Sequence, residues 1–281
     1  MATGFFTDTT LCIGCKACEV ACKQWNELPS DGFSFTGDSY DNTVELSGTT
    51  WRHVAFVEQI AATPDGVEDR WLMSSDVCKH CENAGCLEAC PTGAIIRNEF
   101  GSVYIQPDVC NGCGYCVVSC PFGVVDLIDS LGGTAKYSTA NLQESRLDAS
   151  KTALAHTGGV AGKCTLCYDR QTLGMVPACA KACPTDSIQF GDVATLRERA
   201  KERVTTLHAR GETSAQLYGA DDIGGGIGTL NAFFLLKDRP SVYNLPERPV
   251  LPSTRQPDGY AAAAVIAVGL AIAGWAIFRS A

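Results

Sequence analysis

The stretch Cys12-Ile-Gly-Cys15-Lys-Ala-Cys18-Glu-Val-Ala-Cys22 decides the fold expected for this chain of 281 residues. Its spacing, Cys-x2-Cys-x2-Cys-x3-Cys, returns in a group that begins at Cys110, and two more groups differ only by a wider loop between their second and third cysteines. The four groups contain all sixteen cysteines: Cys12, Cys15, Cys18 and Cys22; Cys78, Cys81, Cys86 and Cys90; Cys110, Cys113, Cys116 and Cys120; Cys164, Cys167, Cys179 and Cys183. A proline follows the final cysteine in the last three groups. The repeat is one of motif rather than of whole domain.

This spacing is the one found in bacterial ferredoxins, where three closely spaced thiolates bind three corners of a [4Fe–4S] cube. The fourth thiolate of each run ligates the neighbouring cluster, so the runs work in pairs. A zinc ion held by four thiolates is the alternative, and the two separated cysteine pairs of the last group suit it best. Zinc sites do not ordinarily use the full run followed by proline. Sixteen thiolates in four such groups therefore favour four [4Fe–4S] clusters.

Composition excludes several function classes. The chain is too long to be a small scaffold held by disulfides in place of a core. Its formal charge is −9, from 22 Lys plus Arg against 31 Asp plus Glu, and no basic block offers a surface for nucleic acid. Bound clusters would make the protein still more acidic. Many one-electron carriers without an evident substrate site indicate electron transfer rather than hydrolysis or hydride transfer.

Residues outside the four groups offer little other chemistry. The glycine-rich run that begins at Gly224 lacks the strand and helix of a nucleotide-binding turn, so we expect an ordinary turn. The four histidines show no paired spacing for haem or zinc, and only His80 lies near a cysteine group. We expect His80 to support a cluster or to lie at the surface, not to be a ligand. Lys163, directly before Cys164, is a candidate for lying between clusters and raising a reduction potential.

Periodicity predicts a few elements around the cysteine groups. Residues 51–60 and 70–74 flank a Pro-Asp-Gly turn and predict one hairpin, and residues 94–97 and 102–106 predict a second. A helix is expected over residues 193–210, with a capping aspartate before it and a glycine just after it.

The two ends of the chain differ from its middle. The first eight residues carry no positive charge, so we expect any export to depend on a partner. Residues 260–278 carry no charge and predict a transmembrane helix, since their length nearly reaches the ~30 Å hydrocarbon thickness; a buried helix of a soluble domain is the alternative. A proline-rich linker over 246–259 joins this helix to the cysteine-containing region 1–245. That region includes an irregular insertion over 130–162, rich in Ser, Thr, Ala and Gly.

Several segments resemble a known family. They are the first cysteine run, Cys22-Lys-Gln-Trp25-Asn26, Gly112-Cys113-Gly-Tyr-Cys116 and Lys163-Cys-Thr-Leu-Cys167-Tyr-Asp-Arg170. They resemble the four-cluster iron–sulfur subunits of molybdopterin oxidoreductases, and most closely the beta subunit of respiratory formate dehydrogenase. The resemblance implies an α+β fold built as a tandem bacterial-ferredoxin-like domain, a double 2x[4Fe-4S] unit with irregular insertions and one C-terminal transmembrane helix. In it the first cysteine group pairs with the fourth, and the second with the third.

The resemblance also implies four ligand sets, numbered in the family's order from electron entry to exit. The first set is Cys12, Cys15, Cys18 and Cys183; the second is Cys22, Cys164, Cys167 and Cys179; the third is Cys78, Cys81, Cys86 and Cys120; the fourth is Cys90, Cys110, Cys113 and Cys116. Formate would be oxidised at a molybdenum or tungsten bis-pterin centre on a catalytic subunit. Electrons would then pass to a cytochrome b membrane subunit and the quinone pool, and this chain would itself perform no bond chemistry.

The resemblance places the chain at the cell membrane, held by its C-terminal helix, with its bulk on the extracytoplasmic face. A cytoplasmic face is equally compatible with the sequence. A second hypothesis is the equivalent subunit of a complex that acts on a sulfur compound, a sulfoxide or nitrate. A third is a zinc-stapled structural or interaction module. No nucleic-acid partner is expected.

Overall fold

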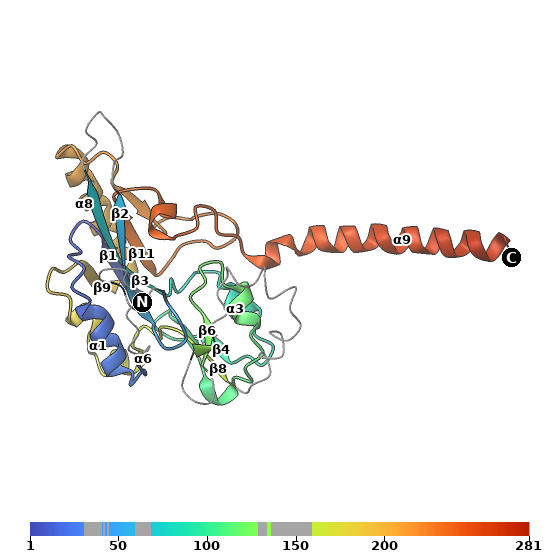
Figure 1. The fold of residues 1–281 in the computed structure, drawn as a ribbon, viewed down its shortest axis with the longest axis horizontal. Coiled ribbons are helices and arrows are strands. Elements are labelled where there is room, and N and C mark those ends of the chain that lie inside the picture. The colour runs from blue at the N-terminus through green and yellow to red at the C-terminus, as the bar shows by residue number, and fades with distance from the viewer. Residues whose placement is uncertain are drawn as a thin grey trace.

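The computed structural model describes residues 1–30, 41, 43, 45–59, 69–128, 134–135 and 159–280. Strands and short helices alternate along these residues, and one long helix, α9 (Gln256–Ser280), projects away from the rest as a single rod (Figure 1). This mixed content agrees with the expected α+β class. The short helices lie in or beside the cysteine groups: α1 (Ala17–Trp25), α2 (Gly85–Glu88), η1 (Pro107–Val109), α3 (Tyr115–Ser119), α6 (Tyr168–Thr172) and α7 (Ala178–Lys181).

A four-stranded sheet forms the largest sheet of the described chain. Its strand order is β10 (Gln216–Tyr218), β11 (Ala232–Leu236), β1 (Thr3–Asp8) and β9 (Ile188–Asp192). β1 runs parallel to β11 and antiparallel to β9. The Phe6 and Phe233 rings are fully buried and stack with their centroids 5.5 Å apart. Burying a phenylalanine side chain stabilises a fold by about 1.5–3 kcal/mol. This sheet was not among the elements expected from the sequence.

Both hairpins expected from the sequence are present. β2 (Arg52–Gln59) pairs antiparallel with β3 (Arg70–Val77), so that Arg52 lies opposite Val77. β4 (Ile95–Arg97) pairs antiparallel with β5 (Val103–Ile105). A further small sheet joins β6 (Asp126–Ile128) to β7 (Thr134–Ala135) on one side and to β8 (Val160–Gly162) on the other.

Most of the insertion expected over residues 130–162 lies outside the described residues. The parts that are described are not irregular, because β7 and β8 both pair with β6 through backbone hydrogen bonds. The strand β8 ends directly before Lys163. The last residues of the insertion therefore form a regular strand that leads into the last cysteine group.

The helix expected over residues 193–210 is α8 (Val193–Ala209), and it packs against β1 and β9. The Asp192 side chain caps it by accepting a hydrogen bond from Thr195 N at 3.0 Å, a contact that stabilises a helix by about 1 kcal/mol. Gly211 follows with a φ of 92°. The run that begins at Gly224 is a turn, as expected, in which Ile227 N donates to Gly224 O at 3.1 Å.

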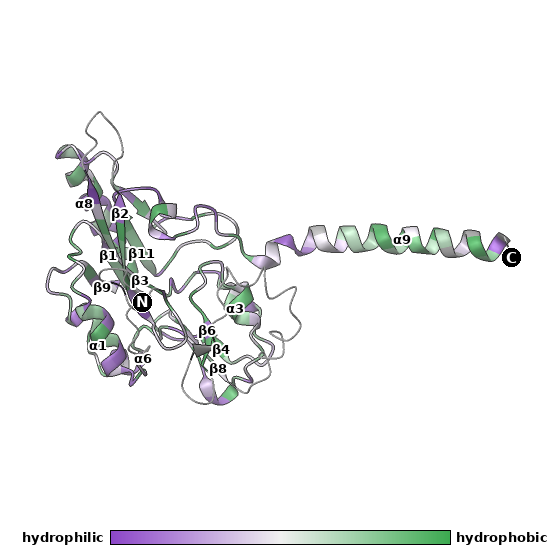
Figure 2. Cartoon of the chain, viewed as in Figure 1, coloured by the Kyte–Doolittle hydropathy of each residue, from purple (hydrophilic) through white to green (hydrophobic). Residues whose placement is uncertain are grey.

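α9 (Gln256–Ser280) follows the short turns η3 (Pro240–Tyr243) and η4 (Pro252–Arg255). Its middle is apolar, and polar residues lie at both of its ends (Figure 2). The helix is long and apolar enough to cross a membrane, with a mean hydropathy of 2.3 in its most apolar part, none of which is buried. Residues 256–259, assigned to the linker from the sequence, form its first turn, where a proline is tolerated.

Candidate metal-cluster sites

Strand pairing brings the first and fourth cysteine groups together. β1 ends shortly before Cys12, and β9 begins shortly after Cys183, so the antiparallel pairing of β1 with β9 places these two loops side by side. α1 carries Cys18 and Cys22 and packs against α7, which carries Cys179. The two groups therefore share one site region although more than 140 residues separate them.

The second and third groups are joined by the same construction. β4 follows the second group, β5 precedes the third, and the two strands form a hairpin. α2 carries Cys86 and packs against α3, which carries Cys116, just as α1 packs against α7. The pairing of β6 with β8 then brings the end of the third group close to the start of the fourth. The two halves thus have corresponding layouts around their cysteines.

Each group makes the same left-handed turn at the residue before its second cysteine. The φ angles are 67° at Gly14, 45° at His80, 71° at Gly112 and 57° at Leu166. Glycine adopts this conformation freely, whereas a residue with a side chain is strained there by about 1–2 kcal/mol. At Leu166 the turn aims the backbone N–H at Cys164 Sγ, 3.3 Å away. The shared backbone turn shows that all four loops are wound in one way.

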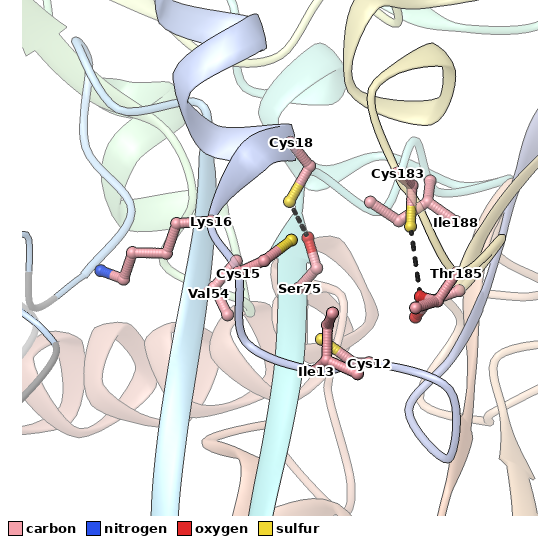
Figure 3. A pocket seen from close by; sticks show the side chains of 11 residues that line it. Cys12, Ile13, Cys15, Lys16, Cys18, Val54, Ser75, Cys183, Thr185 and Ile188 are labelled. Atoms are coloured by element: carbon pink, nitrogen blue, oxygen red, sulfur yellow. Dashed lines mark hydrogen bonds between the residues drawn. The ribbon is translucent and has the colours of Figure 1, made fainter.

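The four cysteines of the first set surround one hollow (Figure 3). Cys12 and Cys15 come from the loop after β1, Cys18 from α1 and Cys183 from the turn that follows α7. The remaining lining includes Val54, and it contains no aspartate, glutamate or histidine. Sulfur is therefore the only strong metal ligand that the hollow offers, as an iron–sulfur cluster or a thiolate-bound soft metal requires.

The four cysteines of the fourth set line a second hollow. They come from the end of the second group, Cys90, and from the third group, Cys110, Cys113 and Cys116. Leu127 and Ala161 complete the wall, and this lining again includes no aspartate, glutamate or histidine. The two ends of the cysteine array therefore present matching cavities with one kind of ligand.

The second and third sets contain more buried cysteines than the first and fourth sets do. Burial raises the pKa of Cys22 well above its ordinary value, and its neighbours Cys164, Cys179 and Cys167 raise it further. Burial likewise raises the pKa of Cys81, with further increases from Cys78, Cys120 and Cys86. The structure thus brings together the members of every ligand set that the resemblance implies. Their role as ligands remains a prediction, and binding a metal would release their protons.

Hydrogen-bond donors surround the sulfur atoms. Ser75 Oγ lies 3.2 Å from Cys18 Sγ, Ala161 N donates to Cys110 Sγ at 3.4 Å, and Asn26 Nδ2 donates to Cys22 Sγ at 3.7 Å. Such donors stabilise thiolates and raise the reduction potential of a bound cluster.

A single metal ion and a cluster need different arrangements of their ligands. Within the described residues, no three side chains of His, Cys, Asp or Glu are arranged to hold one metal ion. Four thiolates on one zinc would bring their sulfur atoms within roughly 3.8 Å of each other, because each Zn–S bond is about 2.3 Å. A cube spreads its four thiolates over four different irons. The sulfur-only lining and the aimed donors fit a [4Fe–4S] cluster.

Lys163 lies where the second and third sets meet. Its side chain is buried, and Nζ donates to Val103 O at 2.5 Å and to Cys164 O at 3.2 Å. Burial lowers its pKa, but the nearby Cys78, Cys86 and Cys164 outweigh this effect, so the pKa is raised and the side chain keeps its charge. Lys163 therefore occupies the position between neighbouring sites that was suggested for it, and its effect on a potential remains a prediction.

His80 is fully buried, so the surface position allowed for it from the sequence is wrong. Its Nδ1 accepts a hydrogen bond from Val103 N at 3.1 Å. Burial, with the charge of Lys163, holds the pKa of His80 well below its ordinary value, and the ring is neutral. His80 supports the loop of the second cysteine group.

Two residues beside the sulfur atoms were not found from the sequence. Arg52 is buried at the start of β2, and Ser75 lies on β3 within hydrogen-bond distance of it. Neither residue belongs to a spaced motif. In the sequence, Arg52 is a charged residue within a strand that is predicted to be half-buried. This pattern does not indicate which face of the strand the residue occupies.

Comparison with known proteins points to iron–sulfur chemistry. Residues 11–94 match one family described as a 4Fe-4S dicluster domain, and residues 69–149 and 150–193 match a second with the same description. The formate dehydrogenase-O iron–sulfur subunit of Escherichia coli K12 is 38% identical over 251 residues, which are 88% of this chain and 72% of that protein.

Two more relatives from the same organism extend the comparison. The iron–sulfur subunit of the nitrate-inducible formate dehydrogenase is 37% identical over 246 residues, which are 86% of this chain and 71% of that protein. The B subunit of the anaerobic dimethyl sulfoxide reductase is 32% identical over 196 residues, which are 70% of this chain and 76% of that protein. The similarity thus extends well beyond the cysteine groups.

Proposed function

Because this protein belongs to the family of formate dehydrogenase iron–sulfur subunits, we propose that it carries four [4Fe–4S] clusters and relays electrons within a membrane-bound formate dehydrogenase. When bound, the clusters supply one-electron transfer. The chain holds them through the four ligand sets described above. It spaces them, shields the inner ones from water and tunes them through buried charges and hydrogen bonds.

The observation that carries this proposal is the order in which the sets adjoin. After burial, which is the largest effect in each case, Cys179 of the second set raises the pKa of Cys18 of the first. In the same way Cys78 of the third set acts on Cys164 of the second, and Cys116 of the fourth acts on Cys86 of the third. These electrostatic interactions between successive sets support one continuous path, first to fourth.

The exposure of the cysteines supports a path with two accessible ends. All four cysteines of the second set are buried, and so are Cys78 and Cys86 of the third, in which Cys81 and Cys120 are partly exposed. In the first set Cys15 is exposed, and in the fourth set Cys90, Cys110 and Cys113 are partly exposed. A relay needs its end carriers near the partners that deliver and accept electrons, while its inner carriers benefit from exclusion of water.

We assign the entry to the first set and the exit to the fourth. The delivering partner is a catalytic subunit that oxidises formate at a molybdenum or tungsten bis-pterin centre. The accepting partner is a cytochrome b membrane subunit that reduces quinone. Similarity to formate dehydrogenase iron–sulfur subunits supports the catalytic partner, and the C-terminal helix supports the membrane location.

The proposed organisation has three parts: an electron-transfer region over 1–245, a connector over 246–259, and a transmembrane segment over 260–278. α9 has 25 residues and is therefore about 37 Å long at ~1.5 Å per residue, enough for the ~30 Å hydrocarbon core with some tilt. A large exposed apolar surface such as that of α9 is unusual in a soluble monomer. We propose that the bulk of the chain lies on the extracytoplasmic side.

One experiment tests the substrate assignment. The complex is isolated anaerobically from native membranes, and formate is added while the broad visible absorbance of the clusters is followed. We expect formate to bleach this absorbance as fully as a low-potential reductant such as dithionite. If dithionite bleaches the sample and formate does not, the relay stands but the formate assignment fails.

The similarity to the B subunit of dimethyl sulfoxide reductase favours one alternative, in which the same relay serves a catalytic subunit that acts on a sulfoxide, another sulfur compound or nitrate. The residues of this protein would do the same work in either complex. Reoxidation of the reduced clusters by a sulfoxide or by nitrate, in the absence of a response to formate, would identify this alternative.

A further inference from the structure

A buried positive charge lies between the first two ligand sets. Arg52 is 1% exposed, and within the described residues no carboxylate forms an ion pair with it. The thiols that act on it most strongly are Cys179, Cys164 and Cys22 of the second set and Cys18 of the first. A buried charge without a partner is costly, so a guanidinium in this position calls for a negative group beside it.

The guanidinium is held in place by neutral contacts. Nη1 donates to Ser75 Oγ at 3.0 Å and lies 3.4 Å from Ser75 O, and the group stacks over the Phe5 ring at 4.8 Å from its centroid. Nε and Nη2 are buried and have no hydrogen-bond partner among the described residues. Two donor nitrogens of the guanidinium, with three N–H groups, are thus available to the sulfur-lined sites.

Ser75 connects this charge to the first set. Its Oγ accepts a hydrogen bond from Arg52, so its own hydrogen is free to point elsewhere. Cys18 Sγ lies 3.2 Å from the same oxygen. With Cys18 as a cluster thiolate, the hydroxyl must donate to sulfur, because a thiolate has no proton to give. The hydrogen bond from Arg52 is compatible with this direction, because it occupies a lone pair of the Ser75 oxygen and leaves the hydroxyl hydrogen for sulfur.

We propose that Arg52 is a fixed positive charge shared by the first two clusters, and that it raises the reduction potentials of these two more than those of the third and fourth. Reduction adds one negative charge to a cluster, and a cation beside it stabilises that added charge in a medium of low dielectric constant. Ser75 adds a hydrogen bond that acts on the first cluster alone. This inference rests on the proposed function, since it assumes that both sites hold clusters.

The test compares midpoint potentials of the four clusters, followed by electron paramagnetic resonance in the intact complex that carries a variant of this subunit. In Arg52→Gln we expect two of the four clusters to become harder to reduce, with about a tenfold lower ratio of reduced to oxidised cluster at a given potential, equal to about 59 mV. In Ser75→Ala we expect the midpoint potential of one cluster, that of the first set, to fall. In Arg52→Lys the charge remains, and the two shifts are at most about a third as large as in Arg52→Gln.

Arg70→Gln is the matched control. Arg70 lies at the other end of the same hairpin, where it pairs with Asp238 at 3.2 Å, and its substitution removes the same charge without changing any of the four potentials. Four clusters that titrate unchanged in Arg52→Gln would overturn the inference, as would Arg52→Lys shifting as far as Arg52→Gln. If Arg52→Gln does not assemble, the other two variants still test the inference. Unchanged cluster potentials in Ser75→Ala would overturn the role of the Ser75 hydrogen bond. In Arg52→Lys, potential shifts of about 59 mV in the first two clusters would overturn the role of the positive charge.

The wild-type complex separates this inference from the proposed function. Fewer than four cluster signals assigned to this subunit in the wild-type protein would contradict the proposed function itself. Four signals in the wild type with no change in the variants would contradict only the role of Arg52.

Discussion

Lys163 and His80 hold the same residue from two sides. Lys163 Nζ donates to Val103 O at 2.5 Å, and Val103 N donates to His80 Nδ1 at 3.1 Å. Both side chains are buried, and they come from the fourth and second cysteine groups, whereas Val103 begins the strand that leads to the third. Three of the four groups are therefore tied to one backbone position.

This arrangement gives a first prediction. Lys163→Met removes the donor to Val103 O and leaves a buried carbonyl without its partner, which we expect to destabilise the protein by about 1–3 kcal/mol. The measurement is the temperature at which the complex loses its visible cluster absorbance. Lys201→Met is the control, because Lys201 lies half exposed on α8 and its removal should change that temperature little. Equal effects of the two variants would contradict the account.

The left-handed turns give a second prediction. A Cβ at Gly112 would lie 2.1 Å from Gly159 O, a backbone atom that cannot move aside easily. At Gly93, with a similar φ of 68°, an added Cβ meets nothing within 4 Å. We expect Gly112→Ala to lose the cluster of the fourth set and Gly93→Ala to keep it. Native mass spectrometry of the subunit measures this loss, and retention of every cluster in Gly112→Ala would refute the expected clash.

The order of the sets gives a third prediction. Cys116→Ser should perturb the cluster of the fourth set, the proposed exit, while the first three sets keep their ligands. Formate oxidation with an artificial dye that accepts electrons at the catalytic subunit should continue, and quinone reduction should fall at least tenfold. Both rates are measured on one membrane preparation. Undiminished quinone reduction would rule out the fourth set as the exit.

A buried ion pair gives a pH-dependent prediction. His53 Nε2 lies 3.0 Å from Asp41 Oδ2, and Nδ1 lies 3.9 Å from Glu19 Oε1. Burial lowers the pKa of His53, but the hydrogen bond to Asp41 and the contact with Glu19 outweigh it and raise the pKa to about 9 from 6.5. The folded protein therefore binds this proton more tightly than the unfolded chain does.

Protonated His53 therefore stabilises the folded protein, and this stabilisation depends on pH. The stabilisation is fully present below pH about 6.5 and is lost as the pH rises through about 9, and it amounts to at most about 3 kcal/mol. The measurement is the urea concentration that halves the visible cluster absorbance, at several pH values. Wild type should lose resistance between pH about 6.5 and 9, and His53→Gln should lack this loss. Identical pH profiles for the two proteins would argue against the pair.

The sequence allowed some elements to be predicted because their signals are local. The hairpin of β2 and β3 has alternating strands around a turn, and α8 has a cap, an apolar face and a glycine behind it. The sheet that joins β1 to β11 was not predicted, because two short apolar runs more than 220 residues apart carry no local sign of their pairing. Long-range partners depend on the whole chain.

The same contrast applies to the sites. Regular spacing identified all sixteen cysteines, and the position of Lys163 next to a cysteine made it a candidate. Arg52 gave no such sign, because only the packing of the β2 and β3 hairpin against Phe5 and α1 turns its side chain toward two sites. For His80 the sequence left a supporting position and a surface position open, because a histidine within a tight cysteine loop has no periodicity from which to infer burial.

The central claim is that this protein holds four [4Fe–4S] clusters on its sixteen cysteines. Native mass spectrometry of the anaerobically isolated complex, with this subunit released and weighed intact, tests it most directly. We expect the subunit to exceed the mass of its polypeptide by four Fe4S4 units. A mass excess that corresponds to zinc ions, or to fewer than four such units in a fully active complex, would contradict the account.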